Sequence, residues 1–133
     1  MKTTVYHCSP DRITHFKCDR GTHFGGERSA IQAGRRKLSN IGHKDEYKGQ
    51  ETLYMHVCEL DLTSLSLYET FDKGGYEEWQ REIRFAREEG FKVMVYHNKY
   101  EPDTVPSYIV LDESLITIKR RYEVCRCDPL YYG

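Results

Sequence analysis

Three short segments of the sequence carry side chains that can bind a nucleotide or move a proton. The first, VYHCSP, ends a run of strand-forming residues with His7, and the second, GTHFGG, is a glycine-led turn that presents His23. The third, VYHNKYEPDTVPSYIV, follows a strand with a polar, proline-broken connection that holds His97 and Glu101. Functional residues concentrate at such positions because a rigid strand orients them while the adjoining loop admits a ligand. Histidine and glutamate together indicate general acid–base catalysis or recognition of ribose hydroxyls.

The overall composition limits the class of protein. A chain of 133 residues is the usual size of one domain with one core, so we expect a single domain over residues 1–133. The 20 Lys and Arg residues against 21 Asp and Glu leave a net charge of −1, without the basic excess of a nucleic-acid-binding domain. No apolar run approaches the roughly 20 residues that span a bilayer, and MKTTVYHCSP lacks the apolar segment of a signal peptide. We therefore expect a soluble, cytoplasmic protein with no membrane or nucleic-acid partner.

The cysteines indicate neither a disulfide framework nor a zinc site. Five cysteines is an odd number in a chain without an export signal, which predicts thiols in a reducing compartment. Cys125 and Cys127 form a C-x-C pair, but no second pair stands at zinc-ligand spacing. We therefore predict no disulfide and no bound metal.

The hydrophobic pattern predicts short strands and two helices. The stretch TLYMHVCELDL has apolar residues on both faces, which predicts a central strand. Strands outnumber helices and there is no regular βαβ alternation, so the predicted fold class is α+β. The predicted strands are residues 3–6, 52–62, 91–97, 107–112 and 115–124, and the predicted helices are residues 25–38 and 76–90.

Each predicted helix has one apolar side. In the second helix, apolar residues recur at helical spacing and predict a stripe facing the core, not a cofactor: Tyr76, Trp79, Ile83 and Ala86. Gly90 is the expected stop signal. In the first helix, Ala30, Ala33 and Leu38 lie on roughly one side, and the cluster of Arg35, Arg36 and Lys37 is interpreted as a solvated face.

In order along the chain, VYHCSPDRITHF, GTHFGGERSA and VMVYHNKYEPDTVPSYIVLDESLI resemble the three motifs of the ADP-ribosyltransferase superfamily. There, the first motif is a strand-end His followed by Gly and Ser or Thr, the second is a Gly-x-Tyr-Phe turn, and the third supplies a Glu. In small bacterial and phage members the third motif runs Tyr-x-Asn-x-x-Glu, a short loop and Ser-Tyr-Ile-Val. Tyr96, Asn98, Glu101 and residues 107–110 match this variant. The resemblance spans most of the chain, from Val5 to about Ile116.

This resemblance implies both a fold and an activity. The fold is a split β-sheet core with two or more short helices around an NAD-binding cleft, and the activity is that of an NAD⁺-dependent mono-ADP-ribosyltransferase. His7 is implied to contact the adenosine-ribose hydroxyl, with Ser9 supporting the same pocket. Glu101 is implied to bind the nicotinamide-ribose 2′-hydroxyl and to stabilise the oxocarbenium-like cation that develops as nicotinamide leaves.

The chain departs from the family pattern at two of the implied NAD⁺-binding positions. Cys8 replaces a Gly whose backbone holds the nicotinamide amide, so we expect a side chain to crowd this spot. His23 replaces a Tyr that stacks on nicotinamide, and Ser29 is an implied partner of the nicotinamide amide. The positions assigned to NAD⁺ are His7, Cys8, Ser9, His23, Phe24, Ser29 and Asn98, with Glu101 as the catalytic residue.

The resemblance leaves the acceptor open. Arginine-modifying members carry a second Glu two residues before the catalytic one, and another branch carries Gln, whereas this chain has Lys99. Arginine modification by the usual route is therefore not expected, and plain NAD⁺ glycohydrolysis remains open. Residues 39–51 and 70–76 are the loops expected to recognise a protein target. Small phage-borne and toxin members of the fold, including an anti-CRISPR inhibitor that modifies a host defence complex, suggest a host protein as the target.

Two hypotheses come from other classes of protein. The chain is either a catalytically inactive module that binds a host or antitoxin protein, with Cys8 and His23 as signs of decay, or a metal-independent ribonuclease. In the ribonuclease, His7, His97 and Glu101 would act as acid and base. The near-zero net charge counts against the ribonuclease, because RNA substrates favour basic grooves. A related branch, the RNA 2′-phosphotransferases, expects arginines near its histidine, and YHCSP has none adjacent.

Overall fold

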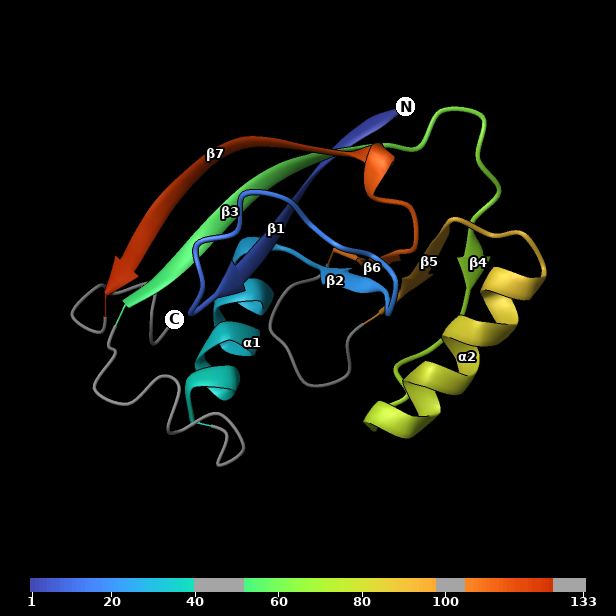
Figure 1. Ribbon diagram of the computed structural model, residues 1–133, viewed down its shortest axis with the longest axis horizontal. Coiled ribbons are helices and arrows are strands. Elements are labelled where there is room, and N and C mark those ends of the chain that lie inside the picture. Colours follow the sequence, from blue (N-terminus) through green and yellow to red (C-terminus); the bar gives the residue numbers. More distant parts are fainter. Residues whose placement is uncertain (40–51, 98–104, 126–133) are drawn as a thin grey trace.

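The computed structural model describes residues 1–39, 52–97 and 105–125, which form two β-sheets and two α-helices (Figure 1). Sheet A has the strand order β1-β3-β7, and these strands are Lys2–Ser9, Thr52–Asp61 and Ile116–Cys125. Sheet B has the strand order β2-β6-β5-β4, and these strands are Thr22–Phe24, Ser107–Val110, Val93–Tyr96 and Tyr68–Glu69. The α-helices are α1, Glu27–Ser39, and α2, Tyr76–Glu88, and a 3₁₀ turn, Glu113–Leu115, precedes β7. The predicted α+β class is confirmed.

Sheet A is built around the strand that the sequence marks as central. β3 pairs antiparallel with β1 along one edge and with β7 along the other. Buried side chains lie on both of its faces, as expected of a central strand. β1 is longer than predicted. It extends from Lys2 to Ser9 because pairing with β3 continues to Ser9 opposite Tyr54, so His7 and Cys8 lie within the strand instead of after it.

Sheet B contains one parallel pair that the sequence pattern did not indicate. β4 has two residues, Tyr68 and Glu69, which pair parallel with Met94 and Val95 of β5. Parallel neighbours need a crossover connection, and α2 provides it. A two-residue strand is too short to produce a hydrophobic alternation, which is why periodicity alone missed it.

Each helix covers a different sheet (Figure 1). In α2, Trp79, Ile83 and Ala86 are buried against sheet B, as predicted, but Tyr76 is 60% exposed and is not part of the stripe. In α1, the predicted side is confirmed at Ala30, which is buried, and at Leu38, which packs against the same cluster, and it is wrong at Ala33. The buried positions are Ser29, Ala30, Ile31 and Gly34, whereas Ala33 is exposed.

A shared apolar cluster holds the two sheets together. Val5 and Leu60 of sheet A pack in one cluster with Phe24, Val93 and Val110 of sheet B. The sheets also meet through an isolated antiparallel bridge between Tyr6 of β1 and Gly25, just after β2, with hydrogen bonds of 2.9 and 3.0 Å. The fold therefore places the ends of β1 and β2 beside each other.

Gly21 precedes β2 with a φ of +77°, in the left-handed region, and a Cβ there would lie 2.8 Å from Ile109 Cγ2 and 3.0 Å from Ile83 Cδ1. We expect Gly21→Ala to lower the free energy of unfolding by about 2–4 kcal/mol, from left-handed strain and overpacking together. Gly90→Ala is the matched control, since Gly90 has a φ of +86° and no atom within 4 Å of the added Cβ. Equal losses for both variants in denaturant unfolding would show that the steric contribution at Gly21 is negligible.

Candidate functional site

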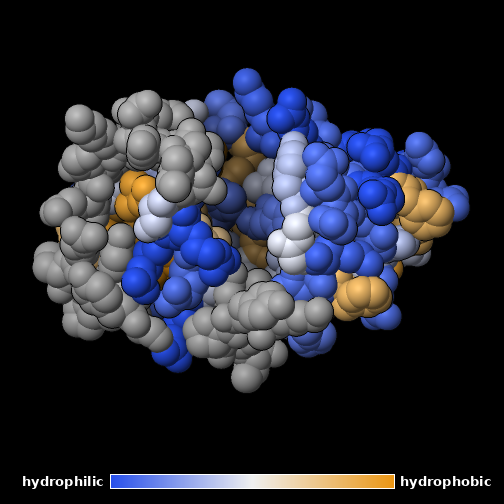
Figure 2. Space-filling view, turned by 90° about the horizontal axis from the view of Figure 1, so that it is seen from below, coloured by the Kyte–Doolittle hydropathy of each residue, from blue (hydrophilic) through white to orange (hydrophobic). Residues whose placement is uncertain are grey.

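A cleft of about 510 Å³ lies between the two sheets. One side is formed by β1 and α1, and the other by β2, β5, β6, the start of α2 and the segment before it. Seen from below, the surface is hollowed between the half of the molecule that carries α1 and the half that carries α2 (Figure 2). A volume of this size falls within the roughly 300–1,000 Å³ that is usual for sites that bind small molecules and cofactors.

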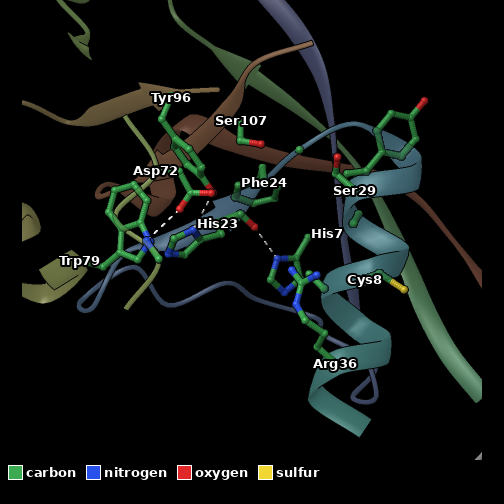
Figure 3. Close-up of a pocket in the computed structure, with 15 residues that line it drawn as sticks. His7, Cys8, His23, Phe24, Ser29, Arg36, Asp72, Trp79, Tyr96 and Ser107 are labelled. Carbon is green, nitrogen blue, oxygen red and sulfur yellow. Dashed lines mark hydrogen bonds between the residues drawn. The ribbon is translucent and has the colours of Figure 1, made fainter. Parts of the chain in front are cut away.

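His7 and His23 meet at the floor of this cleft (Figure 3). His7 Nδ1 donates a hydrogen bond of 2.7 Å to the backbone carbonyl oxygen of His23. The His7 ring also packs edge-on against Phe16, with 5.2 Å between ring centroids, and against Phe24 at 5.6 Å. Burial lowers the pKa of His7 to about 4, so the ring is neutral at pH 7. With the proton on Nδ1, Nε2 is left as a hydrogen-bond acceptor.

The His23 backbone binds His7, whereas the His23 ring belongs to an aromatic group with Trp79 and Tyr96. Its Nδ1 and the Tyr96 hydroxyl are hydrogen bonded at 3.1 Å, and its ring stands edge-on to Trp79 at 5.5 Å. His23 is exposed at the cleft, where its ring packs against the Trp79 and Tyr96 rings. Desolvation of the ring within the cleft lowers the pKa of His23 to about 4, and the negative charge of Asp72 opposes this shift. His23 is neutral at pH 7.

A third histidine, His56, forms a hydrogen bond to the backbone of His7. His56 on β3 is fully buried, and both of its ring nitrogens bind backbone groups. The Ile13 N–H donates to Nε2 at 2.8 Å, so Nδ1 carries the proton and donates to the His7 carbonyl oxygen at 3.0 Å. Arg121 Nε donates in turn to the Ile13 carbonyl oxygen at 2.8 Å. The sequence pattern placed His56 on the central strand and gave it no role, although a histidine within an apolar strand is a signal of a buried polar contact.

Cys8 and Ser9 take structural positions. The Cys8 side chain belongs to the apolar cluster under α1, and a Cβ on Gly34 would lie 3.1 Å from its Sγ. The side chain packs beneath α1, and Cys8 is also among the residues that line the cleft. Burial raises the pKa of its thiol to about 12. Ser9 is buried outside the cleft lining, and its Oγ accepts a hydrogen bond of 3.0 Å from the Asp11 N–H. The predicted NAD⁺ role of Ser9 has no direct geometric support.

The remaining predicted residues divide into two groups. Phe24 and Ser29 are both buried and both line the cleft. Asn98 and Glu101 lie outside the described residues, and their roles stay predictions. The strands that flank residues 98–104 pair Tyr96 with Ser107, and these two residues also line the cleft. His97 is exposed and is not among the lining residues, so it does not join His7 as the ribonuclease hypothesis requires.

The lining residues that were not assigned to the site from sequence include Arg36, Asp72 and Trp79. Arg36 was interpreted as part of a solvated helix face, and Trp79 as a core residue. Trp79 is in fact both, since it is 8% exposed and packs against Tyr96 at the cleft wall. Asp72 received no individual role, and it is the only acidic side chain lining the cleft within the described ranges. No local pattern distinguishes these residues from ordinary surface or core positions.

The known family models, the curated protein sequences and the solved structures contain no match to this chain. No helix in the described part of the chain is long and apolar enough to cross a membrane.

Cys8, Cys18, Cys58 and Cys125 are free thiols, and the described residues include no group of three metal-binding side chains. Cys127 lies outside these residues, so the absence of a disulfide and of a metal stays a prediction.

The lowered pKa values of the two cleft histidines predict a loss of stability in mild acid. In the unfolded chain histidine titrates near a pKa of about 6.5, whereas His7 and His23 titrate near 4 in the folded protein. Between these values the unfolded chain binds more protons, so stability is complete above pH 6.5 and declines as the pH falls toward 4. Melting curves from pH 7.5 to 4.5 measure the decline. A melting temperature unchanged between pH 7 and 5, or histidine NMR titrations centred above pH 6, would contradict the prediction.

Proposed function

We propose that this protein is an NAD⁺-dependent mono-ADP-ribosyltransferase that modifies a protein target. The observation that carries the proposal is the 2.7 Å hydrogen bond from His7 Nδ1 to the His23 carbonyl oxygen on the floor of the cleft. His7 belongs to the first motif that resembles the ADP-ribosyltransferase superfamily, and His23 belongs to the second. Tyr96 and Ser107, which belong to the third, line the same cleft. The division of the core into two sheets around a cleft also supports the proposal.

The chemical character of the lining suits a dinucleotide. Neutral His7 offers Nε2 as an acceptor for a ribose hydroxyl. His23, Trp79 and Tyr96 offer flat aromatic surfaces to a nicotinamide ring. Arg36 offers a guanidinium group, which can bind two phosphate oxygens through bidentate hydrogen bonds.

The proposed reaction transfers the ADP-ribosyl group from nicotinamide to a nucleophile on the target. The bond between ribose C1′ and the nicotinamide nitrogen breaks, its electron pair stays on nicotinamide, and the positive charge moves to the ribose. Glu101 stabilises that charge in the transition state. The nucleophile then bonds to C1′ and loses a proton to solvent, and water in its place gives NAD⁺ hydrolysis.

The direct test is incubation of the purified protein with biotinylated NAD⁺ and host lysate, with free nicotinamide measured in parallel. We expect a labelled protein band together with nicotinamide release. Nicotinamide release without a labelled band would identify a glycohydrolase. Neither signal, with intact NAD⁺ recovered, would favour the inactive protein-binding module.

His7→Ala tests the role of the first motif in binding. Because His7 offers one acceptor to a ribose hydroxyl and packs against the floor of the cleft, its loss should weaken NAD⁺ binding by about tenfold. His15→Ala is the control, since His15 is exposed and lies outside the cleft. Equal NAD⁺ affinities of the two variants by calorimetry would remove His7 from the binding site.

A further inference from the structure

A second groove, apart from the cleft, lies between residues 14–17 and the first half of β7, and we call it the β7 groove. Its volume is about 640 Å³, and it shares no lining residue with the cleft. Its apolar lining residues are Phe16, which is buried, and Ile116 and Ile118, which are half-buried. A groove of this volume with a partly apolar lining suits a small molecule.

Arg121 presents unused hydrogen-bond donors at the β7 groove. Its side chain lines the groove, and its Nε donates a hydrogen bond of 2.8 Å to the Ile13 carbonyl oxygen, which fixes the plane of the guanidinium. Within residues 1–39, 52–97 and 105–125, neither Nη atom of Arg121 has a hydrogen-bond partner or an ion pair. Arg121 is half-buried, so part of the cost of removing its charge from water is offset only when an acceptor binds these N–H groups.

The charges of the β7 groove favour an anion. Lys17 and Arg121 are positive, and Glu113 is the one acidic residue among the described residues of the lining, which leaves an excess of one positive charge with His15 counted as neutral. A guanidinium binds a carboxylate or a phosphate through two parallel hydrogen bonds. The lining therefore combines a group that binds an oxyanion with apolar side chains beside it.

We propose that the β7 groove is a second ligand site, which binds a small organic anion. A carboxylate or phosphate group of the ligand accepts hydrogen bonds from the two Nη atoms of Arg121. The apolar body of the ligand packs against Phe16, Ile116 and Ile118. A bare ion, or an apolar molecule without a charge, makes only one of these two sets of contacts and binds more weakly.

A row of three residues across sheet A joins the β7 groove to the cleft. His7 lies opposite His56 in the pairing of β1 with β3, and His56 lies opposite Arg121 in the pairing of β3 with β7. Ile13 bridges the last two, because its N–H donates to His56 Nε2 at 2.8 Å and its carbonyl oxygen accepts from Arg121. Phe16 packs against the His7 ring at 5.2 Å and the His56 ring at 5.8 Å. A ligand that holds Arg121 therefore orders the segment against which His7 packs, which lowers the entropic cost of binding in the cleft.

The test is an NMR titration of isotope-labelled protein with phenyl phosphate, benzoate, inorganic phosphate and benzyl alcohol. The amide signals of Lys17 and Ile118 report the β7 groove, and those of Gly25 and Ser107 report the cleft. Phenyl phosphate and benzoate should each bind in the groove about tenfold more tightly than inorganic phosphate or benzyl alcohol. A preference between these two anions identifies the anionic group and supports the site in either case.

Arg121→Ala should weaken the binding of both organic anions by about tenfold or more. Arg120→Ala is the matched control for the loss of one positive charge, because Arg120 is exposed, lies opposite Val57 and is outside the groove. If Arg121→Ala does not fold, the order of the probes in the unmodified protein decides, together with Lys17→Ala, which should weaken binding by about threefold. Equal affinity for all the probes, unchanged affinity in Arg121→Ala, or shifts confined to the cleft amides overturns the site.

The link to the cleft is measured separately, and it rests on the proposed function because NAD⁺ is the cleft ligand. Saturating benzoate should tighten NAD⁺ binding by about fivefold in the unmodified protein, and this gain should be absent in Arg121→Ala. Unchanged or weaker NAD⁺ binding overturns the link. No NAD⁺ binding at all contradicts both the transferase and the link, and it leaves the anion site of the β7 groove standing.

Discussion

Glu101→Gln is expected to lower the rate of nicotinamide release from NAD⁺ by about 10²-fold or more, with NAD⁺ affinity largely retained. Glutamine keeps the size of the side chain and its capacity to bind a ribose hydroxyl, but it removes the negative charge that we propose stabilises the developing cation. The measurement is kcat and KM from initial rates of nicotinamide release. A fall in kcat with a nearly constant KM is the expected result.

Asp103→Asn is the matched comparison. Asp103 is the other carboxylate in this connection, one residue past Pro102, and it is expected to be an ordinary loop residue. The motif match assigns the catalytic role to Glu101 through its spacing from Tyr96 and Asn98. An active Glu101→Gln variant beside an inactive Asp103→Asn variant would move the catalytic assignment two residues along the chain.

His56→Leu is expected to lower the free energy of unfolding by about 2–5 kcal/mol. The substitution leaves two partly buried backbone groups without their partner, the carbonyl oxygen of His7 and the N–H of Ile13. Each buried group that loses its hydrogen bond costs about 1–3 kcal/mol. Urea denaturation monitored by circular dichroism measures the loss.

Two further variants test the origin of this loss. His56→Asn has about the shape of one side of the imidazole and should recover part of the stability by restoring one hydrogen bond. His15→Leu replaces an exposed histidine and should change stability by less than about 0.5 kcal/mol. If His56→Leu unfolds like the unmodified protein, the hydrogen bonds of His56 carry no net stability.

The elements with the longest local patterns are among those predicted from sequence. α2 and β3 each have a repeated apolar spacing over about three turns or a full strand, and both occur where expected. β4 escaped prediction because two residues carry no periodicity. The pairing of β1 to Ser9 also depends on β3, which lies far along the chain.

The residues of the candidate site also divide into those that a local sequence pattern indicates and those that only the fold brings together. His7 and His23 were found because each stands in a short motif whose neighbours are informative. Asp72, Trp79 and Arg36 enter the cleft only because segments distant in sequence approach one another. Trp79 shows the limit most clearly, since helical spacing correctly predicts its burial and cannot show that one edge of the ring faces a cavity.

The strand order of sheet A has a consequence for how the chain folds during synthesis. Most of sheet B and its helix lie close together in the sequence, since β4, α2, β5 and β6 all fall within residues 68–110. In sheet A, β3 pairs with β1 near the start of the chain and with β7, which is synthesised last of the strands described, at residues 116–125. The contact from Arg121 to Ile13 closes a separation of 108 residues. Such distant pairing is slow, because the entropy of loop closure is lost before the contacts form. On the ribosome, β3 therefore keeps one unpaired edge until the last strand emerges, and chaperone binding or aggregation competes for the chain during that interval.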